Sequence, residues 1–295
     1  MSICVRIAHL LHPVSATSRR CRWFALLAVV DYATGYLGIF LVASIGRYFR
    51  VPATLLAKIW PARFLLLPMS VPNSLLPAVE LETGIHPTHA VLWLHGLGAD
   101  GHDFVPIVDE LALSSTISVR FVFPHAPMRP VSINRGMVMR AWHDYDVIDA
   151  KLGVQENMES LRSSQQAIEA LIDRERQRGI KPEDIVLAGF SQGGALALHT
   201  GLRYPERLAG VLALSCYLPA PAMLAAEAQP ANLPTSVFMA HGRSDYVVPL
   251  VLAQASKRQL LESGYAVEWH EYSMAHTVCR EEIDDISHWL NHVFK

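Results

Sequence analysis

The sequence lacks most features that assign a chain to a specialised protein class. Its 295 residues include only four cysteines, Cys4, Cys21, Cys216 and Cys279, with no C-x-x-C spacing. This excludes a dense disulfide framework and predicts a reduced, cytoplasmic catalytic or binding domain. No Walker motif, internal repeat or low-complexity tract occurs, so a Walker-type phosphate loop and repeat architectures are not indicated.

Acidic residues are almost missing from the first part of the chain. Residues 1–68 hold eight Lys or Arg and only one acid, Asp31, whereas residues 69–295 hold the other 17 basic and 26 acidic residues. The break predicts two segments of different origin or role, an N-terminal extension (1–68) and a main domain (69–295). The acidic balance of the second segment argues against nucleic acid as a partner.

The extension has two interpretations. The stretch 23–46 is apolar apart from Asp31, which is long enough for a membrane anchor. Its insertion free energy is marginal, and basic residues at both ends give no orientation. Alternatively, residues 1–68 are upstream sequence read from too early a start. Under this second interpretation the protein is cytoplasmic. It contacts a membrane only under the first, in which residues 23–46 are an anchor.

From Leu75 onward, apolar runs alternate with helical patterns. Strands are predicted at Val91–His95, Val119–Pro124, Asp184–Gly189, Gly210–Ser215, Ser236–Ala240 and Val267–Tyr272. Helices are predicted at Asp103–Leu111, Gln155–Arg178, Gly193–Tyr204, Leu250–Ser263 and the C-terminal segment. This alternation predicts an α/β fold with a mostly parallel central sheet and helices on both faces.

One serine has the setting of a nucleophile. Residues 189–193 read Gly-Phe-Ser-Gln-Gly, directly after an apolar strand and before a helical segment. A serine on such a sharp strand-to-helix turn needs small neighbours two residues away on either side. The free N–H groups of the following helix favour a developing negative charge. The pattern therefore predicts that Ser191 is the nucleophile of an acyl-transfer reaction.

Two residues further along have the order expected of its partners. A serine nucleophile needs a base, and the base needs an orienting acid. Asp245 and His276 each follow a predicted strand, in the order serine, acid, histidine that this type of hydrolase uses. Asp245 has an alternative role as a cap for the helix that begins near Pro249. His288 and His292 have metal-ligand spacing but no evident third ligand, so no metal site is predicted.

A glycine-flanked loop supplies the remaining catalytic part. His95-Gly96-Leu97-Gly98 follows the apolar run 90–94, where such enzymes place one oxyanion donor. The backbone N–H groups of Leu97 and Gln192 are the predicted pair. The alternative is a simple strand-to-helix turn that uses glycine.

Five motifs occur in one order and together resemble a known family. They are residues 94–101 (LHGLGADG), 123–127 (FPHAP), 189–194 (GFSQGG), 241–249 (HGRSDYVVP) and 274–276 (MAH). The sequence from about Leu75 onward resembles the phospholipase/carboxylesterase family, which includes bacterial carboxylesterases and acyl-protein thioesterases. The resemblance implies an α/β-hydrolase fold, no cofactor and hydrolysis of carboxylic esters or thioesters. It also implies Ser191, Asp245 and His276 as the catalytic residues.

The substrate is less constrained by the sequence. The family more often has Tyr or Phe at the position of His143, so chain-length preference is open there. Trp142, His143 and Leu218 lie in long connections and are predicted to line the substrate site, with ordinary packing as the alternative. We expect short- to medium-chain esters, then acyl-protein thioesters or lysophospholipids. A non-catalytic binding protein on the same fold is the alternative from another class, and apolar loops are compatible with a homodimer.

Overall fold

The computed structural model describes residues 25–31, 36–42, 75–149 and 153–295, and the chain divides into two units, Met1–Met69 and Ser70–Lys295. In the first unit, β1 (Ala25–Asp31) pairs antiparallel with β2 (Tyr36–Val42). These strands occupy most of the stretch 23–46 that was considered as a membrane anchor. Within the described ranges, no helix is long and apolar enough to cross a membrane. The other residues of the predicted extension lie outside the described part.

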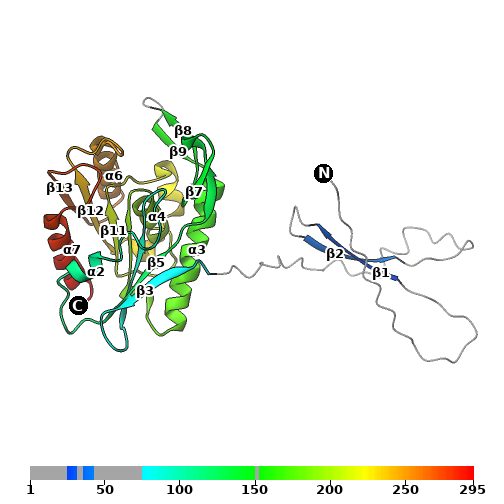
Figure 1. Ribbon diagram of the computed structural model, residues 1–295, viewed down its shortest axis with the longest axis horizontal. Coiled ribbons are helices and arrows are strands. Elements are labelled where there is room, and N and C mark those ends of the chain that lie inside the picture. The colour runs from blue at the N-terminus through cyan, green and yellow to red at the C-terminus, as the bar shows by residue number, and fades with distance from the viewer. Residues whose placement is uncertain (1–24, 32–35, 43–74, 150–152) are drawn as a thin grey trace, which may run out of the picture. The chain divides into compact units, whose positions relative to one another are not determined.

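The second unit is built on a seven-stranded sheet (Figure 1). In spatial order its strands are β13 (Val267–Tyr272), β12 (Ser236–Gly242), β11 (Gly210–Leu214), β10 (Ile185–Phe190), β4 (His89–Leu94), β5 (Val119–Pro124) and β3 (Ala78–Glu82). All neighbours pair in parallel except β3, which is antiparallel to β5. The predicted mostly parallel sheet is confirmed.

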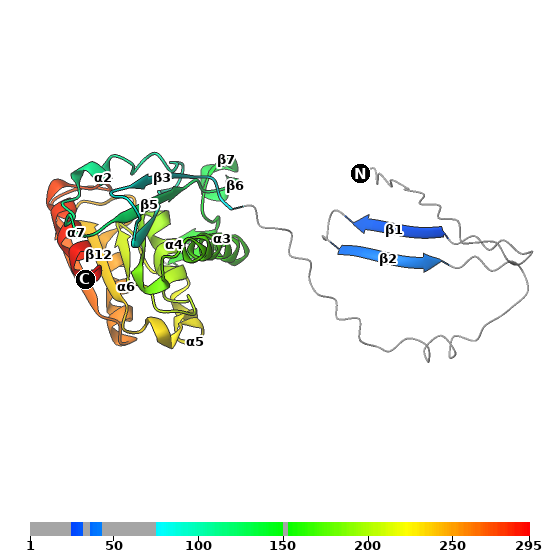
Figure 2. The same cartoon turned by 90° about the horizontal axis from the view of Figure 1, so that it is seen from below.

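Helices cover both faces of this sheet, as predicted (Figure 2). One face carries α3 (Met158–Gln177), α4 (Gln192–Gly201), α5 (Leu224–Glu227) and α6 (Leu250–Glu262), and the other carries α2 (Ile107–Glu110) and α7 (Arg280–Val293). Short 3₁₀ turns occur at Ser132–Asn134, Pro182–Asp184, Pro221–Met223 and Pro230–Asn232.

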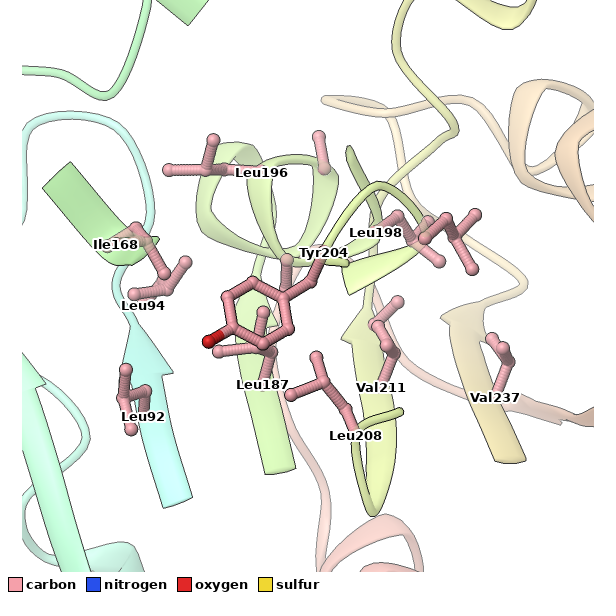
Figure 3. Close-up of a cluster of buried hydrophobic side chains, with 14 of the residues drawn as sticks. Leu92, Leu94, Ile168, Leu187, Leu196, Leu198, Tyr204, Leu208, Val211 and Val237 are labelled. Carbon is pink, nitrogen blue, oxygen red and sulfur yellow. The ribbon is translucent and has the colours of Figure 1, made fainter. Parts of the chain in front are cut away.

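The apolar strands separate two cores by simple alternation. In β4, Leu92 and Leu94 point into the core under α3 and α4, where they lie near Leu187 and Leu196 (Figure 3). Val91 and Trp93 join the opposite core with the residues of α7. Successive side chains of a strand point to opposite faces, and parallel strands between two helix layers are apolar on both. This explains why the apolar runs are nearly continuous.

The order of the strands defines where a site can form. From β4 the chain continues to β5 on one side, whereas β10 is followed by β11, β12 and β13 on the other. β4 and β10 are direct neighbours, so the loops after them diverge at their carboxyl ends. Open α/β sheets bind ligands in the crevice at such a point.

Several predicted elements need correction. The predicted helix Asp103–Leu111 is mostly a series of turns, with α-helix only at Ile107–Glu110. The predicted helix Gln155–Arg178 begins at Met158, because Asn157 caps it by accepting a hydrogen bond from Ser160 N. The long connection between β5 and α3 contains two hairpins, β6 (Met128–Val131) with β7 (Met137–Arg140) and β8 (Tyr145–Asp149) with β9 (Gly153–Glu156). β8 and β9 form a projecting ribbon in Figure 1.

Candidate active site

Ser191 lies on the tight turn between β10 and α4. Its backbone has φ 54° and ψ −121°, outside the region that most non-glycine residues adopt. A Cβ at Gly189 would lie 2.4 Å from the Gly193 carbonyl, and one at Gly193 would lie 2.2 Å from Leu94 O. Both glycines are therefore required by close backbone approach. Ser191 N donates to Leu214 O (2.9 Å), which ties the strained turn to β11 and leaves the partly exposed side chain at the end of the sheet.

Asp245 and His276 are hydrogen-bonded to each other. The distance from His276 Nδ1 to Asp245 Oδ2 is 2.7 Å, the Asp245 side chain is fully buried and the His276 side chain is 16% exposed. The His276 ring also packs against Phe190, with centroids 4.7 Å apart. The structure thus brings the predicted acid and base together, beside the residue that precedes Ser191.

The alternative role of Asp245 as a helix cap does not fit its hydrogen bonds. Its Oδ1 accepts from Val247 N (2.8 Å) and Val248 N (2.9 Å), which precede α6, and α6 itself has no side-chain cap. These bonds hold the carboxylate in the turn and leave Oδ2 to face His276. Charge-assisted bonds to backbone N–H groups stabilise the ionised form of a buried carboxylate.

Sequence reasoning gave no role to His241, which supports this turn. Its Nε2 donates to Val248 O (2.8 Å) and lies 3.4 Å from Asp245 Oδ2. Burial lowers the pKa of His241, so its ring is neutral near pH 7. A neutral His241 does not compete with His276 for an ion pair with Asp245. His241 is part of the sequence motif at 241–245, but the motif does not show which groups its ring contacts.

The two predicted oxyanion donors lie at adjacent loops. Gly96 lies close to Ser191, because a Cβ there would be 3.5 Å from Ser191 Cβ. Gly98, at φ 80°, bends the loop, and Gly98 N donates to Arg140 O (2.9 Å). Within the described residues, neither Leu97 N nor Gln192 N has a protein acceptor, so both are available to a developing oxyanion.

The three residues predicted to line the substrate site are all buried. Trp142 and His143 have 0% exposure and Leu218 has 2%. Trp142 N and Nε1 donate to Gln192 Oε1 and His95 O, while Leu218 N donates to Ser256 Oγ. Burial lowers the pKa of His143 to about 3, with the charge of Arg129 acting in the same direction. All three side chains are therefore packed in the interior, and their substrate-lining roles stay predictions.

The residues nearest to a metal-binding arrangement lie outside the predicted triad. Ligand atoms of Asp100, His102 and His125 fall within 4.8 Å of one another. Two of these groups already accept hydrogen bonds, since Asp100 Oδ1 accepts from His102 N (2.8 Å) and His125 Nδ1 accepts from Gly101 N (3.0 Å). His288 and His292, considered as ligands from their spacing, are exposed on α7, in keeping with a solvated face.

Comparisons with known proteins agree with this geometry. A model of the family described as phospholipase/carboxylesterase matches residues 78–294. Acyl-protein thioesterase 1 of Neurospora crassa is 38% identical over 227 residues, which cover 74% of this chain and 90% of that protein. The crystal structure of SOBER1 from Arabidopsis thaliana is 32% identical, with a TM-score of 0.66 over 70% of this chain and 99% of that chain. Carboxylesterase SOBER1 of the same plant is also 32% identical over 206 residues, which cover 70% of this chain and 90% of that protein.

The resemblance drawn from the motifs is therefore confirmed, as is the α/β-hydrolase fold. The chain belongs to the phospholipase/carboxylesterase family, whose members are serine hydrolases of the carboxylesterase and acyl-protein thioesterase type.

Proposed function

We propose that this protein hydrolyses carboxylic esters of short to medium acyl chains through an acyl-enzyme intermediate on Ser191. The observation that carries the proposal is the 2.7 Å hydrogen bond from His276 Nδ1 to Asp245 Oδ2, beside the strained turn of Ser191. With Nδ1–H held by Asp245, Nε2 of His276 is the free acceptor for the serine proton.

The reaction follows from these positions. Ser191 Oγ attacks the ester carbonyl as His276 takes its proton, and Asp245 stabilises the imidazolium. The N–H groups of Leu97 and Gln192 bind the oxyanion of the tetrahedral intermediate, which collapses as His276 protonates the leaving alcohol. Water, deprotonated by His276, then attacks the acyl carbonyl. The bond from the acyl carbon to Ser191 Oγ breaks as His276 returns the proton to Oγ, and the acid is released. No cofactor takes part in these steps.

Acyl-protein thioesters are the second candidate substrate class. Their support is the similarity to acyl-protein thioesterase 1 of Neurospora crassa, which extends over 90% of that protein. The same residues serve a thioester, because the attack is on the same carbonyl and a thiolate leaves more readily. Lysophospholipids, suggested by the family description, are a third class. A non-catalytic binding role is disfavoured because the nucleophile, base and acid residues are all present.

The decisive test is turnover of p-nitrophenyl acetate, butyrate, octanoate and palmitate by the full chain. We expect release of p-nitrophenol that falls to background in the Ser191→Ala variant and is unchanged in Ser163→Ala, which alters an exposed serine on α3. Turnover that survives Ser191→Ala would contradict the mechanism. A matched octanoyl thioester, hydrolysed with a higher kcat/KM than octanoate ester, would favour the second substrate class.

A further inference from the structure

We infer that Trp142 is a positioning residue that holds the two oxyanion donors, Leu97 N–H and Gln192 N–H, at their working separation. The inference rests on the proposed function, because it concerns the site where that reaction would occur. Trp142 is the second residue after the end of β7 and is fully buried. It is hydrogen-bonded both to the loop that carries the first donor and to the residue that carries the second.

The indole of Trp142 holds the loop of the first donor. Its Nε1–H donates to His95 O (2.8 Å), two residues before Leu97. The His95 ring fixes the same loop from its other side, since Nε2 accepts from Ala126 N (3.1 Å) and Nδ1 donates to Gly96 O (2.7 Å). Burial lowers the pKa of His95 to about 4, so this arrangement of a neutral ring persists near pH 7.

The backbone of Trp142 holds the residue of the second donor. Trp142 N–H donates to Gln192 Oε1 (2.7 Å). The other end of the same amide, Nε2, donates to His143 O (2.9 Å) and to Tyr145 Oη (3.2 Å). The Gln192 side chain is therefore fixed at three points, and its own backbone N–H, at the first position of α4, is fixed with it.

The two loops have no space in which to shift independently. A Cβ at Gly193 would lie 2.6 Å from His95 O, the same carbonyl that accepts from the Trp142 indole. Ser164 Oγ on α3 donates to Trp142 O, which anchors Trp142 to the helix layer. Preorganised donors stabilise an oxyanion only when they are held at the position that the oxygen will occupy. Trp142 contacts both sides of this arrangement through hydrogen bonds.

Trp93 offers a matched comparison. It is also almost fully buried, at 1% exposure, and it packs against Phe104 in the opposite core. Its Nε1 has no hydrogen-bond partner among the described residues. Replacing either tryptophan by phenylalanine removes similar apolar volume from a core, but only the change at Trp142 removes a hydrogen bond to the oxyanion loop.

The test compares Trp142→Phe and Trp93→Phe in the full chain, using the preferred p-nitrophenyl ester. For Trp142→Phe we expect kcat to fall about tenfold, part of the 10²- to 10³-fold that loss of a whole donor costs. KM and the pH dependence of kcat should stay unchanged, because substrate binding and the His276–Asp245 pair are intact. Inhibition by a matching alkyl trifluoromethyl ketone, which adds to the serine as an oxyanion, should weaken by the same factor as kcat. Trp93→Phe should lower thermal stability but leave kcat unchanged.

A kcat for Trp142→Phe equal to that of the wild type would overturn the inference, as would equal losses of kcat in Trp142→Phe and Trp93→Phe. If thermal unfolding shows that Trp142→Phe does not fold, Gln192→Met decides, because it removes the other hydrogen bond of Trp142, from its backbone N–H to Gln192 Oε1, and keeps the Gln192 backbone N–H. We expect the same fall in kcat and in ketone affinity, and full activity of Gln192→Met would refute the inference. Failure of the proposed function would instead appear as an inactive wild type or an active Ser191→Ala.

Discussion

The two carboxylate oxygens of Asp245 have different partners, and this predicts the effect of a single-atom change. In Asp245→Asn, Oδ1 can still accept from Val247 N and Val248 N. The new amide N–H would face His276 Nδ1, where Oδ2 now accepts a hydrogen bond. The ring would then carry its proton on Nε2 and could not accept one from Ser191. We expect kcat to fall by about 10³- to 10⁴-fold with the fold retained.

Steady-state ester hydrolysis and thermal unfolding of this variant, measured together, check the prediction. Asp284→Asn is the matched control, since Asp284 forms only a surface ion pair with Arg280, and such pairs contribute little to stability. Its rate should equal that of the wild type. An Asp245→Asn enzyme with more than about a tenth of wild-type kcat would show that Asp245 does not set the tautomer of His276.

The three candidate site residues could be located in the sequence because each follows a recognisable strand. Ser191, Asp245 and His276 were located from apolar runs and from motif order, and the structure places Asp245 and His276 in contact. The role of Trp142 could not be found in this way. Its partners His95 and Gln192 lie 47 and 50 residues away, and no local pattern reports hydrogen bonds across such separations. The sequence around Trp142 also does not distinguish a tryptophan that lines a pocket from one that supports a loop.

At the scale of elements, α7 carries a carboxyl group in an unfavourable place. Glu282 lies in the first helical turn and is fully buried. Burial raises the pKa of Glu282 to about 8, against the smaller opposing effect of the Cys279 backbone N–H. A carboxyl group whose pKa is higher in the folded than in the unfolded state binds more protons when folded. Its contribution to stability is therefore full below the unfolded pKa and is lost as pH rises toward about 8.

The Glu282→Gln variant should remove this loss, because the amide stays neutral at every pH. We expect similar free energies of unfolding for variant and wild type near pH 4.5. Near pH 8.5 the variant should be more stable, by at most about 5 kcal/mol. Urea denaturation at several pH values measures the difference. A constant offset between the two proteins across this range would show that Glu282 does not titrate on unfolding.

Sequence patterns predicted strands better than short helices, for reasons visible in the structure. The strands Val119–Pro124 and Val267–Tyr272 have the predicted bounds, because continuous or alternating apolar runs determine both. In the predicted helix 103–111, Pro106 has no N–H group and the turns close through bonds such as Ile107 N to Phe104 O. The edge strand β3 was missed because it is largely exposed and carries charges, so it has no apolar run.

At the scale of the whole molecule, the second unit contains every group that the proposed reaction needs. Both cores, the seven-stranded sheet and the candidate site lie within residues 75–295, and the family match covers residues 78–294. The first unit differs from it in charge, with eight basic residues against one acid in residues 1–68. These observations support the proposed boundary near residue 69. The membrane anchor, the cytoplasmic location and the homodimer stay predictions.

The boundary predicts that residues 69–295 fold and react without the extension. A domain with its own hydrophobic core folds independently, and here the buried strands β4, β5, β10, β11 and β12 provide that core. We expect the shortened protein to match the full chain in kcat and KM for the preferred ester. The midpoints of thermal unfolding should agree to within about 2 °C, because a shift smaller than this corresponds to well under 1 kcal/mol in the free energy of unfolding. Parallel assays of the two proteins by ester turnover and circular dichroism make the comparison, and Ser191→Ala in each background confirms that the same serine is used. If the shortened protein unfolds non-cooperatively or loses turnover while the full chain keeps both, residues 1–68 belong to the catalytic unit and the division of the chain proposed here is wrong.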